Sequence, residues 1–128
     1  MQSYRELLVW QKSMNMAEAC YRLTAEFPRD EMYGMTAQFR RAAVSVPANI
    51  AEGHGRENTG SFVQFLRVAQ GSLKELETHR VLAGRVRLVT TDRTAPLLAE
   101  CATTGKMLRS LIRSLQAKGK DRRVDADA

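Results

Sequence analysis

The sequence predicts an all-α protein, an up-down-up-down four-helix bundle whose second helix is kinked by a proline. Apolar residues recur at spacings of three and four in four long segments, the period of one buried helical face. No segment alternates polar and apolar residues as a half-buried strand does. The connections between the four segments are short, which favours antiparallel neighbours. With 128 residues, 44% of them hydrophobic, the chain is long enough to bury a core.

The first helix is expected over residues 4–24. Its proposed buried face is Leu7, Trp10, Met14, Ala17 and Tyr21. The pair Phe27-Pro28 follows, and the residue before a proline is disfavoured in the helical region. Asp30 is then placed to cap the second helix, because its carboxylate can accept from the unpaired amides of a first turn.

The second helix is expected over residues 31–52 and holds the most unusual run of the chain, Gln38 to Gly53. Its proposed buried face is Met32, Met35, Phe39, Ala42, Val46 and Ile50. Pro47 lies in its interior, where proline removes a backbone donor and costs about 3 kcal/mol. Gly53 is placed as the C-terminal cap, a position that glycine favours.

A polar stripe follows the same helix. Its members are Gln38, Arg41, Ser45, Asn49 and Glu52, spaced by three, four, four and three residues. The small side chains beside it allow another helix to approach closely. Two roles stay open: Ser45 or Asn49 bonds the carbonyl that Pro47 leaves free, or the stripe forms a polar network at an interface, with Arg41 and Glu52 pairing across it.

The third helix is expected over residues 59–88, with Asn58 or Thr59 as its cap. It carries two apolar stripes, which indicates burial by its own bundle and by another chain. The first stripe is Phe62, Leu66, Ala69, Leu73, Leu76 and Ala83; the second is Phe65, Val68, Leu82 and Val86.

The fourth helix has several possible caps, Thr90, Thr91, Asp92 and Thr94, and Pro96 is expected in its first turn. Its proposed buried face is Leu97, Cys101, Thr104, Leu108, Leu111 and Leu115. Residues 1–118 are expected to form the bundle, and residues 119–128 a disordered tail.

The formal charge is +6, and the last ten residues are neutral, so the excess belongs to residues 1–118. A basic folded body attracts RNA or DNA, although solubility alone also explains such a charge. Arg80, Arg85 and Arg87, near the turn between the third and fourth helices, are the first candidates for nucleic-acid binding. The next candidates are Arg40, Arg41 and Arg56. A solvated helix end is the alternative for the first group.

Enzymatic and metal chemistry find little support. His79 has Leu76 three residues before it, so the Glu-x-x-His pattern of di-iron bundles is missing. We expect no catalytic residues, no metal and no cofactor, and we expect Cys20 and Cys101 to be buried free thiols. No apolar run is long enough to cross a membrane, and the first residues do not look like a signal peptide, so a cytoplasmic protein is expected.

The chain resembles the four-helix-bundle family known as S23 ribosomal proteins, which includes proteins encoded by intervening sequences in 23S rRNA genes. It is also similar to the accessory proteins of diversity-generating retroelements. The matching segments are residues 8–12, 27–28, 33–35, 38–53, 65–66, 71–73, 75–78 and 112–115. The match over Arg40 to Gly53 is the specific one.

The resemblance implies a bundle that assembles into a ring-like homopentamer with a basic surface. For the retroelement members it implies binding to a reverse transcriptase and to nucleic acid, and it supplies no catalytic residues. We therefore expect a non-enzymatic homo-oligomer that binds RNA or DNA through a basic surface. The alternative is a protein-binding adaptor, for example an accessory subunit of a reverse transcriptase, whose basic charge is incidental.

Overall fold

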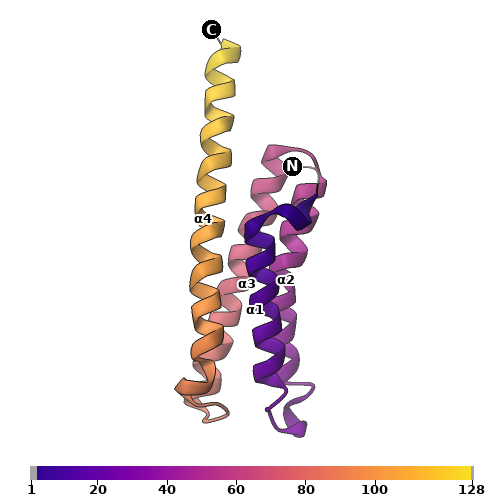
Figure 1. Ribbon diagram of the computed structural model, residues 1–128, viewed down its shortest axis with the longest axis vertical. Helices are drawn as coiled ribbons and strands as arrows, with labels where there is room; N and C mark the ends of the chain where they lie inside the picture. Colours follow the sequence, from indigo (N-terminus) through magenta and orange to yellow (C-terminus); the bar gives the residue numbers. More distant parts are fainter. Residues whose placement is uncertain (1–2, 128) are drawn as a thin grey trace.

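The computed structural model describes the backbone of residues 3–127 and the side chains of residues 3–119, which form four long helices (Figure 1). The helices are α1 (Leu8–Thr24), α2 (Met35–Gly55), α3 (Thr59–Arg85) and α4 (Thr91–Asp127). Two short 3-10 helices, η1 (Tyr4–Glu6) and η2 (Arg29–Glu31), precede α1 and α2. The predicted all-α class is confirmed.

The four helices pack as a bundle in which every consecutive pair is antiparallel. α1 contacts α2 and α4, and α3 contacts α2 and α4, whereas the diagonal pairs make no close backbone contact in the described part of the chain. The α1–α2 and α3–α4 connections lie at one end of the bundle, and the α2–α3 loop lies at the other (Figure 1). This is the up-down-up-down topology predicted from the short connections.

The end of α4 projects beyond the other three helices (Figure 1). Its backbone is helical as far as Asp127. The expected disordered tail, residues 119–128, falls mostly on this projecting stretch. The disorder expected for these residues in solution stays a prediction.

The core draws side chains from all four helices. Phe39 of α2 is fully buried, and its ring meets that of Phe27 edge to face at 5.2 Å between centroids. The predicted faces of the second and fourth helices, apart from Met32, and the first stripe of the third helix are buried or half-buried in this core. The second stripe of the third helix differs, because Val68, Leu82 and Val86 are exposed.

The predicted face of the first helix is partly wrong. Met14 and Tyr21 are exposed. The residues of α1 that are buried are Val9, Ser13, Met16, Ala17, Ala19, Cys20, Leu23 and Thr24. Apolar residues lie on two overlapping faces of this helix, and the positions of α2 and α4 decide which of the two is covered.

The start of the second helix also differs from the prediction. α2 begins at Met35 rather than at residue 31, and no side chain caps it. Asp30 lies instead in η2, where the amide of Glu31 donates to the carbonyl of Pro28 at 3.0 Å. The chain must reverse direction between α1 and α2, and local 3-10 turns satisfy its backbone groups there.

Gly53 is not a helix cap. α2 continues to Gly55, and Gly53 is buried where α2 crosses α3. A Cβ on Gly53 would lie 2.6 Å from the Cβ of Phe65 and 3.1 Å from Cδ1 of Phe62. The missing side chain therefore serves the close approach of two helices rather than a left-handed turn.

Two further predictions concern the starts of α3 and α4, and one of them is confirmed. Asn58 caps α3 as expected, because its Oδ1 accepts from the amide of Ser61 at 2.9 Å. Pro96 is the sixth residue of α4, which begins at Thr91, so it lies in the second turn rather than the first. α4 begins directly after Thr90, the first of the possible caps, whose carbonyl accepts from the amide of Thr94 at 3.3 Å.

Candidate nucleic-acid interface

The centre of the polar stripe joins α2 to α3 within one chain. The hydroxyls of Ser45 and Ser72 are hydrogen-bonded at 2.7 Å. Nδ2 of Asn49 donates to the carbonyl of Ser45 at 2.7 Å and to its Oγ at 3.0 Å. The amide of Asn49 thus bonds the carbonyl of Ser45, and not the Ala43 carbonyl that Pro47 leaves free, which corrects the role expected for it.

The outer members of the stripe face solvent. Gln38, Arg41 and Glu52 are exposed. Nη1 of Arg41 donates to Oε1 of Gln38 at 3.5 Å, and Nη2 of Arg56 lies 3.2 Å from Oε1 of Glu52. Because these contacts stay within one helix or its first following residue, the interface role expected for the stripe stays a prediction.

Arg40 is engaged inside the bundle. Its Nε donates to Oγ1 of Thr24 at 2.8 Å, and its guanidinium lies over the ring of Tyr21 at 4.4 Å from the centroid. The hydroxyl of Thr24 in turn donates to the carbonyl of Cys20 at 2.8 Å. Arg40 therefore links α1 to α2 through its Nε and its contact with the Tyr21 ring.

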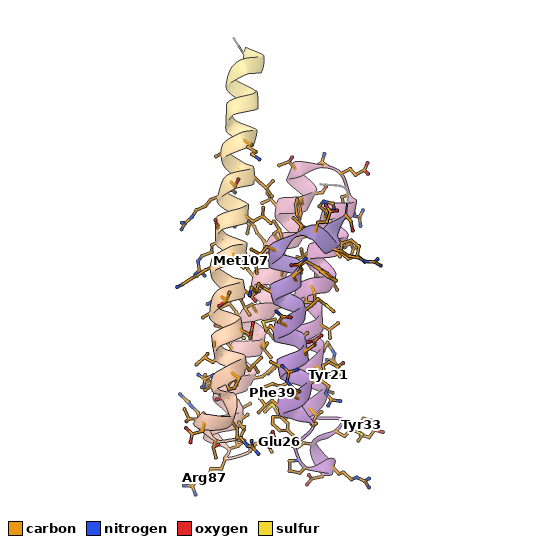
Figure 2. All side chains as sticks on the ribbon, viewed as in Figure 1. Tyr21, Glu26, Tyr33, Phe39, Arg87 and Met107 are labelled. Atoms are coloured by element: carbon orange, nitrogen blue, oxygen red, sulfur yellow. The ribbon has the colours of Figure 1, made fainter. Side chains whose placement is uncertain are left out.

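The six predicted arginines do not form one site. Arg56 lies at the α2–α3 loop, paired with Glu52 and over the ring of Phe65 at 5.1 Å from the centroid. Arg80, Arg85 and Arg87 lie towards the opposite end, at which α3 turns into α4. Figure 2 shows Arg87 at that end, together with Glu26 and Tyr33.

Arg80, Arg85 and Arg87 line one shallow hollow of about 620 Å³ at the α3–α4 turn. The remaining lining residues are Val81, Gly84, Val89, Thr90 and Thr91. Arg85 and Arg87 are exposed and form no ion pair with any described side chain. Arg80 is half-buried, and its buried Nε has no acceptor among the described residues.

Arg87 occupies a backbone position that glycine usually fills. Its φ is 61°, in the left-handed region. The amide of Leu88 donates to the carbonyl of Ala83 at 2.9 Å, and the amide of Arg87 to that of Gly84 at 3.1 Å. These bonds form a Schellman motif with Arg87 at C′, where a residue with a Cβ is disfavoured by about 1–2 kcal/mol.

Three further cations of α3 and α4 lie outside the hollow at the turn. Arg93, which follows the turn, forms an ion pair with Glu26 and so links the beginning of α4 to the end of α1. Arg67 and Lys74, which the sequence reasoning did not single out, line a second hollow farther along α3 and α4. The signal that could have found them is the charge balance of each half of the chain.

The described residues offer no metal site, since no three His, Cys, Asp or Glu side chains come together. Cys20 and Cys101 are both free and buried, as expected. Burial raises the pKa of each thiol to about 12, so neither is a reactive thiolate near neutral pH. No helix in the described part of the chain is long and apolar enough to span a membrane.

Fold and surface together define a small all-α bundle with a cluster of three arginines at one end. Residues 5–110 match the family described as 23S rRNA-intervening sequence proteins, and the chain belongs to that family. This confirms the resemblance seen in the sequence. Among curated proteins, none matches the chain.

A solved structure has the same fold. It is the crystal structure, at 1.70 Å resolution, of a protein of unknown function from the S23 ribosomal protein family of Bacteroides thetaiotaomicron. Its TM-score is 0.73 at 23% sequence identity, and the match covers 82% of this chain and 98% of that one. At this identity the likeness shows the fold alone.

Proposed function

We propose that this protein is a non-enzymatic nucleic-acid-binding bundle that contacts phosphates through the hollow at the α3–α4 turn. The proposal rests on one observation: the three arginines that line this hollow lack hydrogen-bond or ion-pair partners among the described residues. Arg80 has a buried Nε without an acceptor, and Arg85 and Arg87 have no ion-pair partner among the described residues. A desolvated guanidinium nitrogen without an acceptor is costly, and a phosphate oxygen supplies one.

The backbone at Arg87 supports the same proposal. A glycine at this position would relieve the left-handed backbone, yet the chain places a cationic side chain there. Strained positions persist where the surroundings hold them, and they gather at binding sites. The cost is offset if the guanidinium has a ligand.

The test is a fluorescence-anisotropy titration of labelled RNA and DNA with the wild-type protein and with Arg85→Gln/Arg87→Gln. Each charge-assisted hydrogen bond contributes about 1.5 kcal/mol, and a factor of ten in affinity corresponds to 1.4 kcal/mol. We expect the double variant to bind at least about tenfold more weakly. The control, Arg22→Gln/Arg29→Gln, removes the same charge from α1 and η2.

Two outcomes would overturn the proposal. One is the absence of binding to RNA and DNA by the wild-type protein. The other is an equal loss in the variant and the control, which would show that only total charge matters.

A protein-binding adaptor is the second candidate, and an exposed apolar stripe favours it. Val68 and Leu82 of α3, and Val86 directly after it, are exposed to 52%, 47% and 60%. Such a stripe suits contact with further copies of the chain, a homopentamer by the family resemblance, or with a polymerase such as a reverse transcriptase. Light scattering at micromolar concentration tests self-association, and a monomer mass would refute it.

A further inference from the structure

We propose that the outward face of the α3–α4 hairpin binds double-stranded nucleic acid along its phosphate backbone, without reading bases. This inference rests on the proposed function. It extends the contact from the turn along the length of two helices, and it names the form of nucleic acid that fits.

The first support is the uneven distribution of charge. Residues 1–58, which contain α1 and α2, hold seven basic and seven acidic residues and are neutral. Residues 59–118, which contain α3 and most of α4, hold ten basic and four acidic residues. Because residues 119–128 are also neutral, the whole surplus of six belongs to the α3–α4 half.

The second support is a cation-lined hollow between the two helices, of about 580 Å³. Arg67 and Lys74 line it from α3, and Lys106 and Arg109 line it from α4. All four are exposed. The one acidic residue in the lining is Glu77, whose Oε2 lies 3.3 Å from Nζ of Lys74.

Small residues keep this hollow open. Gly71, Ala102 and Gly105 are part of its lining. A Cβ on Gly105 would lie 3.3 Å from Cδ2 of Leu73 and 3.5 Å from Nη1 of Arg109. The bottom of the hollow, at Gly105, therefore lies against the core, and the four cations line its rim.

This hollow and the one at the turn share one face of α3. Gln70, Lys74 and Glu77 line the first, and Val81 and Gly84 line the second, at successive spacings of four, three, four and three residues. Residues with this spacing lie on one face of a helix. The two hollows therefore form a single basic track.

The length of the track suits a duplex. Arg67 and Arg85 are eighteen residues apart on α3, which corresponds to about 27 Å at 1.5 Å per residue. One turn of B-DNA spans about 34 Å. A duplex laid along the hairpin would turn the phosphates of both strands towards these cations within about one helical turn.

The track has no platform on which a base could stack. The sequence contains no Phe, Tyr or Trp between residues 66 and 119. The aromatic residues of α3, Phe62 and Phe65, lie against Gly53 of α2 instead. Single-strand binders combine a basic groove with aromatic stacking, whereas duplex binding through phosphates needs charge alone.

The experiment compares a labelled duplex of about 16 base pairs, roughly one and a half turns, with an oligothymidine that carries the same number of phosphates. We expect the duplex to bind at least about tenfold more tightly, and a duplex of scrambled sequence to bind within about twofold of the first. Tighter or equal binding of the oligothymidine, or a strong sequence preference, would overturn the inference.

Variants separate this inference from the proposed function. Lys106→Gln/Arg109→Gln should weaken duplex binding about as much as Arg85→Gln/Arg87→Gln does, while Arg22→Gln/Arg29→Gln should leave it unchanged. Loss only in the Arg85/Arg87 variant would overturn the track and leave the turn site in place. No binding of either nucleic acid by the wild-type protein would overturn both. Circular dichroism checks that each variant keeps its helices.

Discussion

Gly53 illustrates what a single residue type leaves open. A glycine near a predicted helix end indicates a left-handed cap, but the same absence of a Cβ also allows two helices to meet. The choice depends on Phe65, twelve residues later, whose Cβ would be 2.6 Å from an added Cβ. The local sequence does not contain that distance, so the cap prediction was reasonable and wrong.

Gly53→Ala should therefore destabilise the protein. The added methyl group forces α2 and α3 apart, and overpacking of this kind costs about 1–3 kcal/mol. Gly71→Ala is the matched control, because a Cβ there meets nothing within 4 Å. The control should be stabilised by about 0.5–1 kcal/mol, since alanine favours a helix interior.

Urea unfolding measures both free energies. If Gly53→Ala were as stable as the control, the close approach of α2 and α3 would not depend on this glycine.

The two buried thiols should make the protein sensitive to alkaline pH. Burial raises the pKa of Cys20 from 9.0 to about 12, and the charge of Arg40 acts in the opposite direction. Burial is also the main cause for Cys101, and the charge of Glu77 adds to it. Above pH 9 the unfolded thiols lose protons that the folded thiols keep, so the free energy of unfolding falls as pH rises.

The contribution of each thiol is fully present below pH 9 and declines towards pH 12. The expected loss is on the order of 1 kcal/mol per thiol at pH 10. Urea unfolding at pH 8 and pH 10 measures it. Cys20→Ala/Cys101→Ala should show a shallower decline over this interval, and an identical decline in both proteins would contradict the account.

At the scale of elements, the number, order and approximate limits of the helices could be predicted, because each helix shows three- and four-residue apolar spacing. Which face of α1 is covered could not. Two sets of apolar residues overlap on that helix, and only its contacts with α2 and α4 select Met16 and Cys20 over Met14 and Tyr21. The polar bond from Ser45 to Ser72 is a second case, since it joins residues on different helices.

Arg87 both ends α3, through its left-handed backbone, and lines the hollow of the candidate site. Arg87→Gly should stabilise the protein by about 1 kcal/mol, because glycine adopts the left-handed C′ position without the Cβ penalty. The same substitution should weaken nucleic-acid binding, because it removes one of the three arginines of the hollow. Arg85→Gln is the control that removes a charge without changing a left-handed residue.

Urea unfolding and anisotropy titration together check this prediction. A variant that is both more stable and as tightly bound as the wild-type protein would show that Arg87 has no part in binding. A variant that is less stable would show that its side chain is needed for the turn itself.

At the scale of the whole molecule, the charge balance of each half of the chain can be counted in the sequence, but the packing of the basic half into one side of the bundle cannot. The sequence placed the excess in residues 1–118, whereas the fold places α3 beside α4 and so gathers the surplus on one side. Of the six arginines predicted to bind nucleic acid, the structure groups Arg80, Arg85 and Arg87, and it engages Arg40 and Arg56 in contacts within the chain. No spacing rule connects Arg40 to Thr24 and Tyr21, or Arg56 to Phe65. The ion pair of Arg56 with Glu52 follows the i,i+4 spacing and could have been predicted.

The central claim is that phosphates bind the basic α3–α4 half, and the salt dependence of duplex binding tests it most directly. The two hollows hold seven cations. One phosphate contact for each predicts a slope of about −6 for the logarithm of the association constant against the logarithm of salt concentration. Arg85→Gln/Arg87→Gln should reduce the steepness of that slope by about two. A slope near zero, or the same slope in both proteins, would contradict the claim.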